Sequence, residues 1–343
     1  MTEGQWQDLC AAVSGKTFEK PLTAFIADSP WLPEWTKKHS ILDYYTSDDV
    51  WLKVNLEAIR SFPETIFLPG FWSEYGMCTE PSAFGSRLIW HEHELPFAEA
   101  VWHDSERAPV LNPPDVASAG LLPFALRRLQ RCRPAIEAEG HSIRFAVARG
   151  PLNIASFLMG TTEFLTAMQC DPEGTHGMLE VITRFLEEWI QLQAKTIPTI
   201  RGVMLLDDIV GFIGPEDVRT FAAPYLTRAF AAIDSEVRLF HNDADGLSCA
   251  PILADCGVNL FNFAFHHPIQ EMRERVGPTV TLLGNIPPRD VLAAGTPADV
   301  EQAVECMKTV LGGDFGRVIF SCGGGIPPGV SSENLSVFLA AAR

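Results

Sequence analysis

Two short apolar runs of the sequence end at side chains that can bind a metal ion. Residues 237–245, VRLFHNDAD, carry His241 and Asp243, and residues 317–329, RVIFSCGGGIPPG, carry Cys322. Residues two apart in an extended chain point to the same side, so His241 and Asp243 could share one ion. With the Cys322 thiolate they would form a three-ligand zinc site whose open fourth position activates a bound group. The structural alternative is that His241 bonds a loop, Asp243 caps a helix and Cys322 is a buried filler.

Other polar side chains also follow apolar runs. Asp207 and Asp208 end the run VMLLDD, where one could cap the next helix and the other could orient a ligand histidine or bind substrate. Further residues of this kind are Asp28, Arg149, His266, His267 and Asn285. If the runs are the parallel strands of a barrel, these side chains would gather at one mouth.

Eight apolar runs with strand character alternate with helical patterns. The predicted strands are residues 21–26, 65–68, 142–147, 202–206, 237–240, 259–265, 280–283 and 317–320, and the predicted helices include 116–139, 154–168 and 247–256. This alternation fits either a closed barrel or a doubly wound open sheet. No glycine fingerprint for a dinucleotide follows the first strand, and the polar strand ends fit a barrel mouth. We therefore predict an α/β fold, a (β/α)8 TIM barrel, in one domain over residues 1–343.

The second predicted strand is followed by a long segment, residues 69–114, that is rich in glycine, proline and aromatic residues. A connection of this length is unusual and predicts an active-site insertion, with a hairpin around residues 87–93. Its aromatic residues could wall an apolar substrate or could anchor the loop; they are Phe71, Trp72, Tyr75, Phe84 and Trp90. The alternation WHEHEL at residues 90–95 resembles a metal site but is also typical of a solvated hairpin strand.

Composition excludes several classes of protein. The chain has 343 residues and a formal net charge of -17, so we expect no nucleic-acid partner. No apolar run is long enough to span a bilayer and the first ten residues do not resemble a secretory signal, so we expect a cytoplasmic protein without membrane contact. The eight cysteines show no close pairing, and most are expected to be reduced and buried.

The sequence resembles the uroporphyrinogen decarboxylase superfamily over nearly its whole length. The matching segments are PLTAFIADSPWLPEW, RGPLNIASFLMGTTEFLTAMQCDPE, LLDDIVGFIGPEDVRTFAAPYL, GNIPPRDVLAAGTPADVEQAV and SCGGGIPPGVSSENL. This superfamily, whose fold is a (β/α)8 barrel, includes the decarboxylase and zinc-dependent corrinoid methyltransferases. The decarboxylases carry two substrate-binding arginines where this chain has Ile26 and Pro30. The methyltransferases bind zinc through a His-x-Cys and a later Cys; His241 and Cys322 match, whereas Asp243 stands at the first cysteine.

The resemblance therefore implies the methyltransferase branch. The expected enzyme moves a methyl group between a small methyl ether, or a methyl thioether or thiol, and a corrinoid (methylcobamide or cobalamin) carried by a partner protein. Zn²⁺ would be held by His241, Asp243 and Cys322, with His266 or His267 as a further ligand. Replacing a thiolate by a carboxylate makes zinc a stronger Lewis acid and favours ethers.

The remaining candidates have secondary roles. Asp207, Asp208 and Asn285 are the catalytic candidates, and Arg149 joins the five aromatic residues of the insertion as a substrate-binding candidate. The alternatives are a metal-free lyase of the decarboxylase type and a non-catalytic binding protein on the same barrel.

Overall fold

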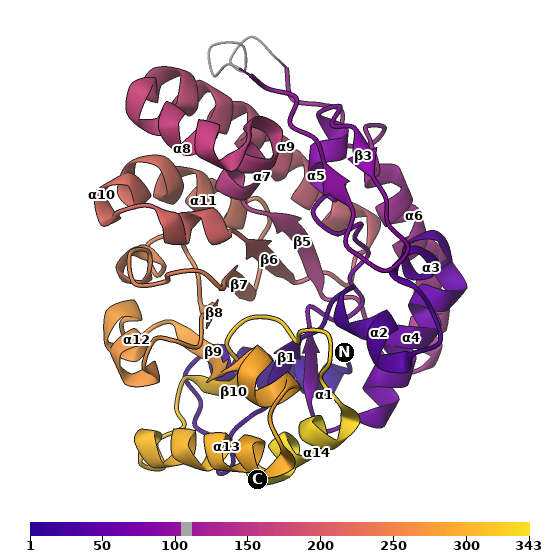
Figure 1. Cartoon of the computed structure of the whole chain (residues 1–343), viewed down its shortest axis with the longest axis vertical. Coiled ribbons are helices and arrows are strands. Elements are labelled where there is room, and N and C mark those ends of the chain that lie inside the picture. Colours follow the sequence, from indigo (N-terminus) through magenta and orange to yellow (C-terminus); the bar gives the residue numbers. More distant parts are fainter. Residues whose placement is uncertain (104–111) are drawn as a thin grey trace.

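The computed structural model, which describes residues 1–103 and 112–343, contains all eight predicted strands as parallel neighbours (Figure 1). Six of them form one sheet in the order β10-β9-β8-β7-β6-β5, and β1 pairs with β2. Two isolated parallel bridges, from Thr23 to Phe320 and from Ile26 to Gly325, place β1 beside β10. The strands are β1 (Ala24–Ile26), β2 (Ile66–Leu68), β5 (Phe145–Arg149), β6 (Gly202–Leu206), β7 (Val237–Asn242), β8 (Leu260–Phe263), β9 (Thr281–Ile286) and β10 (Val318–Cys322). The predicted barrel is confirmed.

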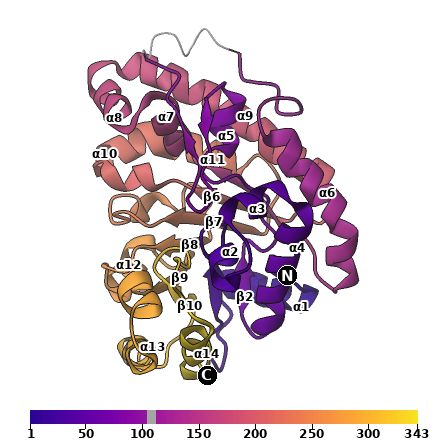
Figure 2. The same ribbon diagram turned by 45° about the vertical axis from the view of Figure 1, so that its right-hand side comes forward.

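Helices surround the strands on the outside (Figures 1 and 2). They are α2 (Trp31–Thr36), α3 (Ile41–Thr46), α4 (Asp48–Ser61), α6 (Leu122–Ala138), α7 (Pro151–Met159), α8 (Thr161–Cys170), α9 (Pro172–Thr196), α10 (Pro215–Asp217), α11 (Ala223–Phe230), α12 (Ile269–Val276), α13 (Pro297–Leu311) and α14 (Ser332–Ala341). The segment between β2 and α6 contains a short helix, α5 (Thr79–Ala83), and a hairpin of β3 (Leu88–Ile89) and β4 (Phe97–Ala98).

Three predicted helices differ from the structure. The run 154–168 is divided into α7 and α8 at Gly160, whose φ of 101° interrupts a helix, and the helix predicted from 116 begins only at Leu122. Within 247–256 only one short turn forms, Ala250–Ile252. No helix in the described part of the chain is long and apolar enough to cross a membrane.

Alternate residues of the strands fill the interior of the barrel. One apolar cluster contains Ala24, Ile26, Ile66, Leu68, Phe145, Val147, Met204, Leu206, Val237, Leu239, Leu260, Leu283 and Ile319. Helix α1 (Glu3–Val13) joins this cluster, and its Trp6 ring meets Phe145, the first residue of β5, edge-on at 5.6 Å. Because α1 covers the end at which the strands begin, the interior is accessible only from the carboxyl ends, where barrel enzymes place their chemistry.

Candidate metal centre

The carboxyl ends of the strands replace this apolar filling with polar side chains. In β7, Leu239 lies in the interior cluster and His241 follows two positions later; Leu206 and Asp208 have the same relation after β6. A cavity of about 490 Å³ opens above them. Its charged and histidine lining residues are Asp28, Glu74, His93, Glu94, Arg149, Asp208, His241, Asp243 and Arg289, and the glycine-rich segment 323–328 lies along one side.

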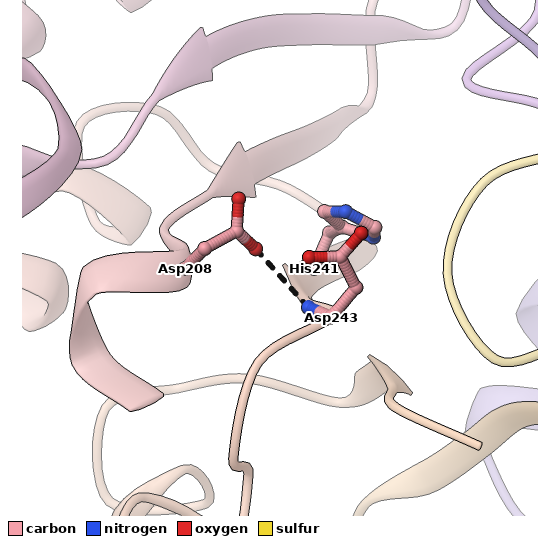
Figure 3. Close-up of side chains that lie close together, drawn as sticks. All are labelled: Asp208, His241 and Asp243. Carbon is pink, nitrogen blue, oxygen red and sulfur yellow. Dashed lines mark hydrogen bonds between the residues drawn. The ribbon is translucent and has the colours of Figure 1, made fainter. Parts of the chain in front are cut away.

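Three of these side chains form a compact group (Figure 3). One ligand atom from each of Asp208, His241 and Asp243 lies within 4.8 Å of the other two. The backbone N–H of Asp243 donates to Oδ1 of Asp208 over 3.1 Å, which fixes the two loops relative to each other. Burial raises the pKa of the Asp208 carboxyl, while His241 acts in the opposite direction. The predicted proximity of His241 and Asp243 is confirmed, and Asp208 is an additional neighbour.

The hydrogen bonds of Asn262 orient the His241 ring. The Asn262 side-chain amide donates to the carbonyl oxygens of Leu283 (2.8 Å) and Cys322 (3.3 Å), so its Oδ1 faces His241 Nδ1 at 2.7 Å as an acceptor. His241 must then carry its proton on Nδ1, which leaves the lone pair of Nε2 free for a ligand. A histidine held through its second nitrogen is the arrangement that metal-binding histidines adopt. Asn262 was not predicted as a site residue, because it lies within the apolar run LFNFAF.

One imidazole nitrogen and two carboxylates fit the ligand preferences of Zn²⁺. The group is not closed, because Asp243 is exposed and the cavity continues above it. A metal held there would keep a position open toward the cavity, as in catalytic rather than structural zinc sites.

Two predicted ligands lie outside this group. Cys322 is fully buried, its Sγ lies 3.5 Å from the carbonyl oxygen of Gly324, and burial raises the pKa of its thiol to about 12. It belongs to the same outer cluster as Val318 and Phe320, the alternate residues of β10 that face the surrounding helices. Its loop is nevertheless close, because a Cβ on Gly324 would lie 3.4 Å from Asp243 Cβ. Cys322 stays a predicted ligand.

His267 and the catalytic candidate Asn285 lie in another cavity, together with His266 and Phe265. His267 Nε2 is 3.1 Å from Asp245 Oδ1, and burial lowers the pKa of its imidazole. The Asn285 amide donates to the carbonyl oxygen of His267 over 2.7 Å. In this arrangement Asn285 holds the backbone of the His267 segment.

The adjacent aspartates have different surroundings. Asp207 is fully buried and accepts hydrogen bonds from the backbone N–H groups of Leu152 (2.9 Å) and Asn153 (3.1 Å), in the first turn of α7. A Cβ on Gly150 would lie 2.3 Å from the Asp207 carboxylate, so glycine is required for this close approach. Burial raises the pKa of Asp207 well above its ordinary value. Of the two aspartates, Asp207 therefore caps α7 and Asp208 faces the cavity.

We expect Asp207→Ala to lower the free energy of unfolding by about 2–4 kcal/mol, because two buried N–H groups lose their acceptor. Asp208→Asn, at a side chain without a capping role, should change it by less than about 1 kcal/mol. Urea unfolding of both variants measures the difference. Equal destabilisation would show that Asp207 does not support α7 in this way.

An ion pair connects the end of β5 with the segment that follows β2. Within the described residues these two strands share no backbone ladder. Arg149 Nη2, at the end of β5, lies 3.4 Å from Glu74 Oε2 in the segment after β2, and the guanidinium lies 5.3 Å from the centre of the Trp72 ring. The Arg149 backbone N–H donates to Glu80 over 3.3 Å. Burial and the nearby Glu74 raise the pKa of Asp28 in the same cavity, whereas Arg149 lowers it. Glu74 was not predicted as a site residue, because it lies within the long insertion, where no repeating pattern marks its position.

None of the five predicted aromatic residues lines the barrel-mouth cavity. Phe71 packs against Trp51 at 6.1 Å, and Phe84 against Phe185 at 4.8 Å, so both anchor the insertion to the core. Trp72 belongs to the interior cluster, and Tyr75 and Trp90 line a separate groove. Arg149 does line the barrel-mouth cavity, as expected of a substrate-binding residue.

A (β/α)8 barrel with a cluster of potential metal ligands at its carboxyl mouth defines the class of this protein. The family model for uroporphyrinogen decarboxylase (URO-D) matches residues 10–343, and the chain belongs to that family. Curated relatives named uroporphyrinogen decarboxylase include a protein from Idiomarina loihiensis, which is 25% identical over 77% of this chain and 74% of its own length. Another, from Thioalkalivibrio sulfidiphilus, is 25% identical over 90% of this chain and 89% of its own length.

Two solved structures share the fold. A methyltransferase from Methanosarcina mazei superposes with a TM-score of 0.82 at 18% identity, covering 97% of this chain and 96% of its own. A B12-independent methionine synthase from Shewanella has a TM-score of 0.61 at 11% identity, covering 94% and 98%. At these identities the likeness shows the fold alone.

Proposed function

We propose that this protein is a zinc-dependent methyltransferase that moves a methyl group between a small methyl ether, or a methyl thioether or thiol, and a corrinoid carried by a partner protein. The observation that carries the proposal is the group of Asp208, His241 and Asp243 at the floor of an open cavity. The fold shared with a methyltransferase supports it. In this proposal His241, Asp243 and Asp208 are the three ligands and the fourth position is left for the substrate. Cys322, a further predicted ligand, would enter only in place of one of the carboxylates.

A metal-free decarboxylase is the second candidate, because the curated relatives carry that name. The charge of the cavity argues against a polyanionic porphyrinogen as substrate. Ile26 and Pro30, which stand where the decarboxylases have arginines, both line the cavity. Its lining contains five carboxylates, of Asp28, Glu74, Glu94, Asp208 and Asp243, against two arginines, Arg149 and Arg289. A substrate with many carboxylates would be repelled here.

When bound, zinc would supply Lewis acidity to the substrate oxygen or sulfur. The chain itself supplies orientation and a proton. When an ether loses its methyl group to the cobalt of the corrinoid, the C–O bond breaks, the oxygen keeps the electron pair and needs a proton. Asp28 is the candidate donor, because it lines the same cavity and because burial and the nearby Glu74 raise the pKa of its carboxyl. Arg149, fixed by Glu74, would orient a polar group of the substrate.

The test is methyl transfer to free cob(I)alamin, followed by the loss of its absorbance. Methyl ethers, methyl thioethers and methylamines are offered separately, with Asp208→Asn as the damaged-site variant and His91→Ala, at an exposed loop residue, as the matched control. We expect methyl ethers to be the best donors and Asp208→Asn alone to slow the reaction. Release of CO2 from a carboxylated substrate by metal-free protein, without methyl transfer, would support the decarboxylase instead.

A further inference from the structure

A second cavity, of about 760 Å³, lies outside the barrel mouth between α3, α4, the β3–β4 hairpin and α6, elements that are neighbours in both views (Figures 1 and 2). It is lined by Leu42, Tyr45, Thr46, Ser47, Asp48, Asp49, Tyr75, Trp90, Leu121, Phe124, Arg127, Arg128 and Arg131. We call it the α6 groove. Its volume is in the range of sites for small organic ligands.

The α6 groove contains a buried arginine with unused donors. The Arg128 side chain is only 2% exposed. Its Nε lies 3.1 Å from Asp48 Oδ1, its Nη2 donates to the Tyr45 carbonyl oxygen, and the guanidinium lies 5.2 Å from the centre of the Tyr75 ring. Nη1 is buried and has no hydrogen-bond partner among the described residues. The Arg128 guanidinium therefore places a positive charge behind the wall of the groove, and Asp48 is the carboxylate that pairs with it there.

The wall next to Arg128 is aromatic. The Trp90 ring meets Tyr45 and Tyr75 edge-on at 6.0 and 6.2 Å, and its side is open to solvent, with 38% of the residue exposed. Phe124, from α6, is 61% exposed on the rim. Exposed aromatic faces on both sides of a cavity suit a flat ring, which can stack on them or meet them edge-on.

The charge of the α6 groove differs from that of the whole chain. Its lining has three arginines and two aspartates, whereas the chain has a net charge of -17. Both oxygens of Asp48 are already engaged, Oδ1 by Arg128 and Oδ2 by Arg131, each at 3.1 Å. Arg127, which is exposed, forms no ion pair within the described residues. The cations that remain available favour an anion.

We propose that the α6 groove is a binding site for a small, flat aromatic ring that carries one carboxylate. The carboxylate pairs with Arg127 at the rim of the groove, where the charge of the buried Arg128 adds to the attraction, and the ring lies against Trp90 and Phe124. The site is distinct from the barrel mouth: Tyr45 separates them, with its ring facing the groove and its hydroxyl donating to Ser29, a lining residue of the mouth, over 2.7 Å. The proposal does not depend on methyl transfer.

Calorimetric titration of the full chain with three probes tests the proposal. Benzoate has the ring and the charge, benzamide has the ring alone, and acetate has the charge alone. We expect saturable benzoate binding that is about 10-fold tighter than that of either other probe, as one charge-assisted hydrogen bond or one stacked ring contributes about 1.4 kcal/mol.

Arg127→Gln and Trp90→Ala, both at exposed positions that line the groove, should each weaken benzoate binding about 10-fold. Arg219→Gln, at an exposed arginine of another helix, should leave it unchanged. Three outcomes would overturn the proposal: no saturable binding of benzoate, equal binding of benzoate and acetate, or binding that survives both groove variants but is lost in Arg289→Gln. Arg289 is an exposed arginine of the barrel mouth, so that last result would place the ligand there.

Discussion

His241→Ala is expected to weaken zinc binding by at least about 100-fold. His241 is the one nitrogen donor of the group. Because Asn262 already orients its ring, little conformational entropy is lost when it binds the metal, and its removal takes away a pre-organised ligand. Losing the orienting partner alone, in Asn262→Leu, should cost about 10–100-fold, because the ring could then rotate and change its tautomer. Competition with a chromogenic chelator measures both affinities.

The matched control is His91→Ala. His91 is exposed in the loop of the β3–β4 hairpin, within the histidine- and glutamate-rich run that resembles a metal site in the sequence. We expect this variant to bind zinc as the unaltered protein does. If His91→Ala lost zinc and His241→Ala kept it, the metal would lie in the insertion and not in the barrel. A Cys322→Ser variant measured in parallel shows whether its loop rearranges to add a thiolate.

Arg149→Met is expected to lower the free energy of unfolding by about 3–5 kcal/mol, because it leaves the nearly buried Glu74 carboxylate without its cation. Arg149 also offsets the charge of Asp28 and Glu80, whose pKa values burial already raises. The double variant Arg149→Met/Glu74→Leu should recover much of the loss, since an apolar pair of similar size leaves no unpaired charge. Arg343→Met removes an exposed ion pair with Glu64 and should cost less than about 1 kcal/mol.

The pH dependence of this destabilisation has a definite sign. The pKa of Asp28 is raised from 3.8 to about 8 by folding, so in that interval the folded state binds more protons than the unfolded state and the free energy of unfolding falls as the pH rises. Removing the Arg149 cation raises these carboxyl pKa values further and strengthens the trend. Denaturant titrations of Arg149→Met should therefore show a larger loss at pH 8 than at pH 5. A loss that is independent of pH would mean that the ion pair does not control these carboxyls.

The fold could be predicted from the sequence because its pattern is local. Each strand is a short apolar run and each is separated from the next by a helical pattern, which limits the fold to a barrel or a doubly wound sheet. The polar residues at the strand ends and the missing dinucleotide fingerprint then favour the barrel. Element ends were less predictable, since the division of α7 from α8 depends on the backbone conformation of one residue, Gly160.

Alternation along the strands could have sorted the site residues further. In VMLLDD, Asp208 is two positions after Leu206 and so points to the same side, the interior of the barrel. Asp207 is two positions after Leu205 and so points to the side that faces the helices. The same rule puts Cys322 with Phe320 on the outer side of β10. These assignments need only the sequence and the knowledge that the barrel interior lies on one side.

Other features depend on contacts that no local pattern contains. The ion pair of Arg149 joins residues 75 positions apart, and Glu74 lies in an insertion whose path follows no repeating pattern. The sequence left open whether the aromatic residues of that insertion line a substrate site or anchor the loop; Phe71 and Phe84 pack into the core, whereas Tyr75 and Trp90 line the α6 groove. Only the folded chain shows which wall each ring belongs to.

The most direct measurement is the rate of methyl transfer to cob(I)alamin before and after removal of metal by a chelator, and again after one equivalent of zinc is restored. We expect the rate to be lost with the metal and to return with zinc in the unaltered protein, but not in His241→Ala. Metal-free protein that transfers methyl groups at an undiminished rate would contradict a metal centre built from Asp208, His241 and Asp243.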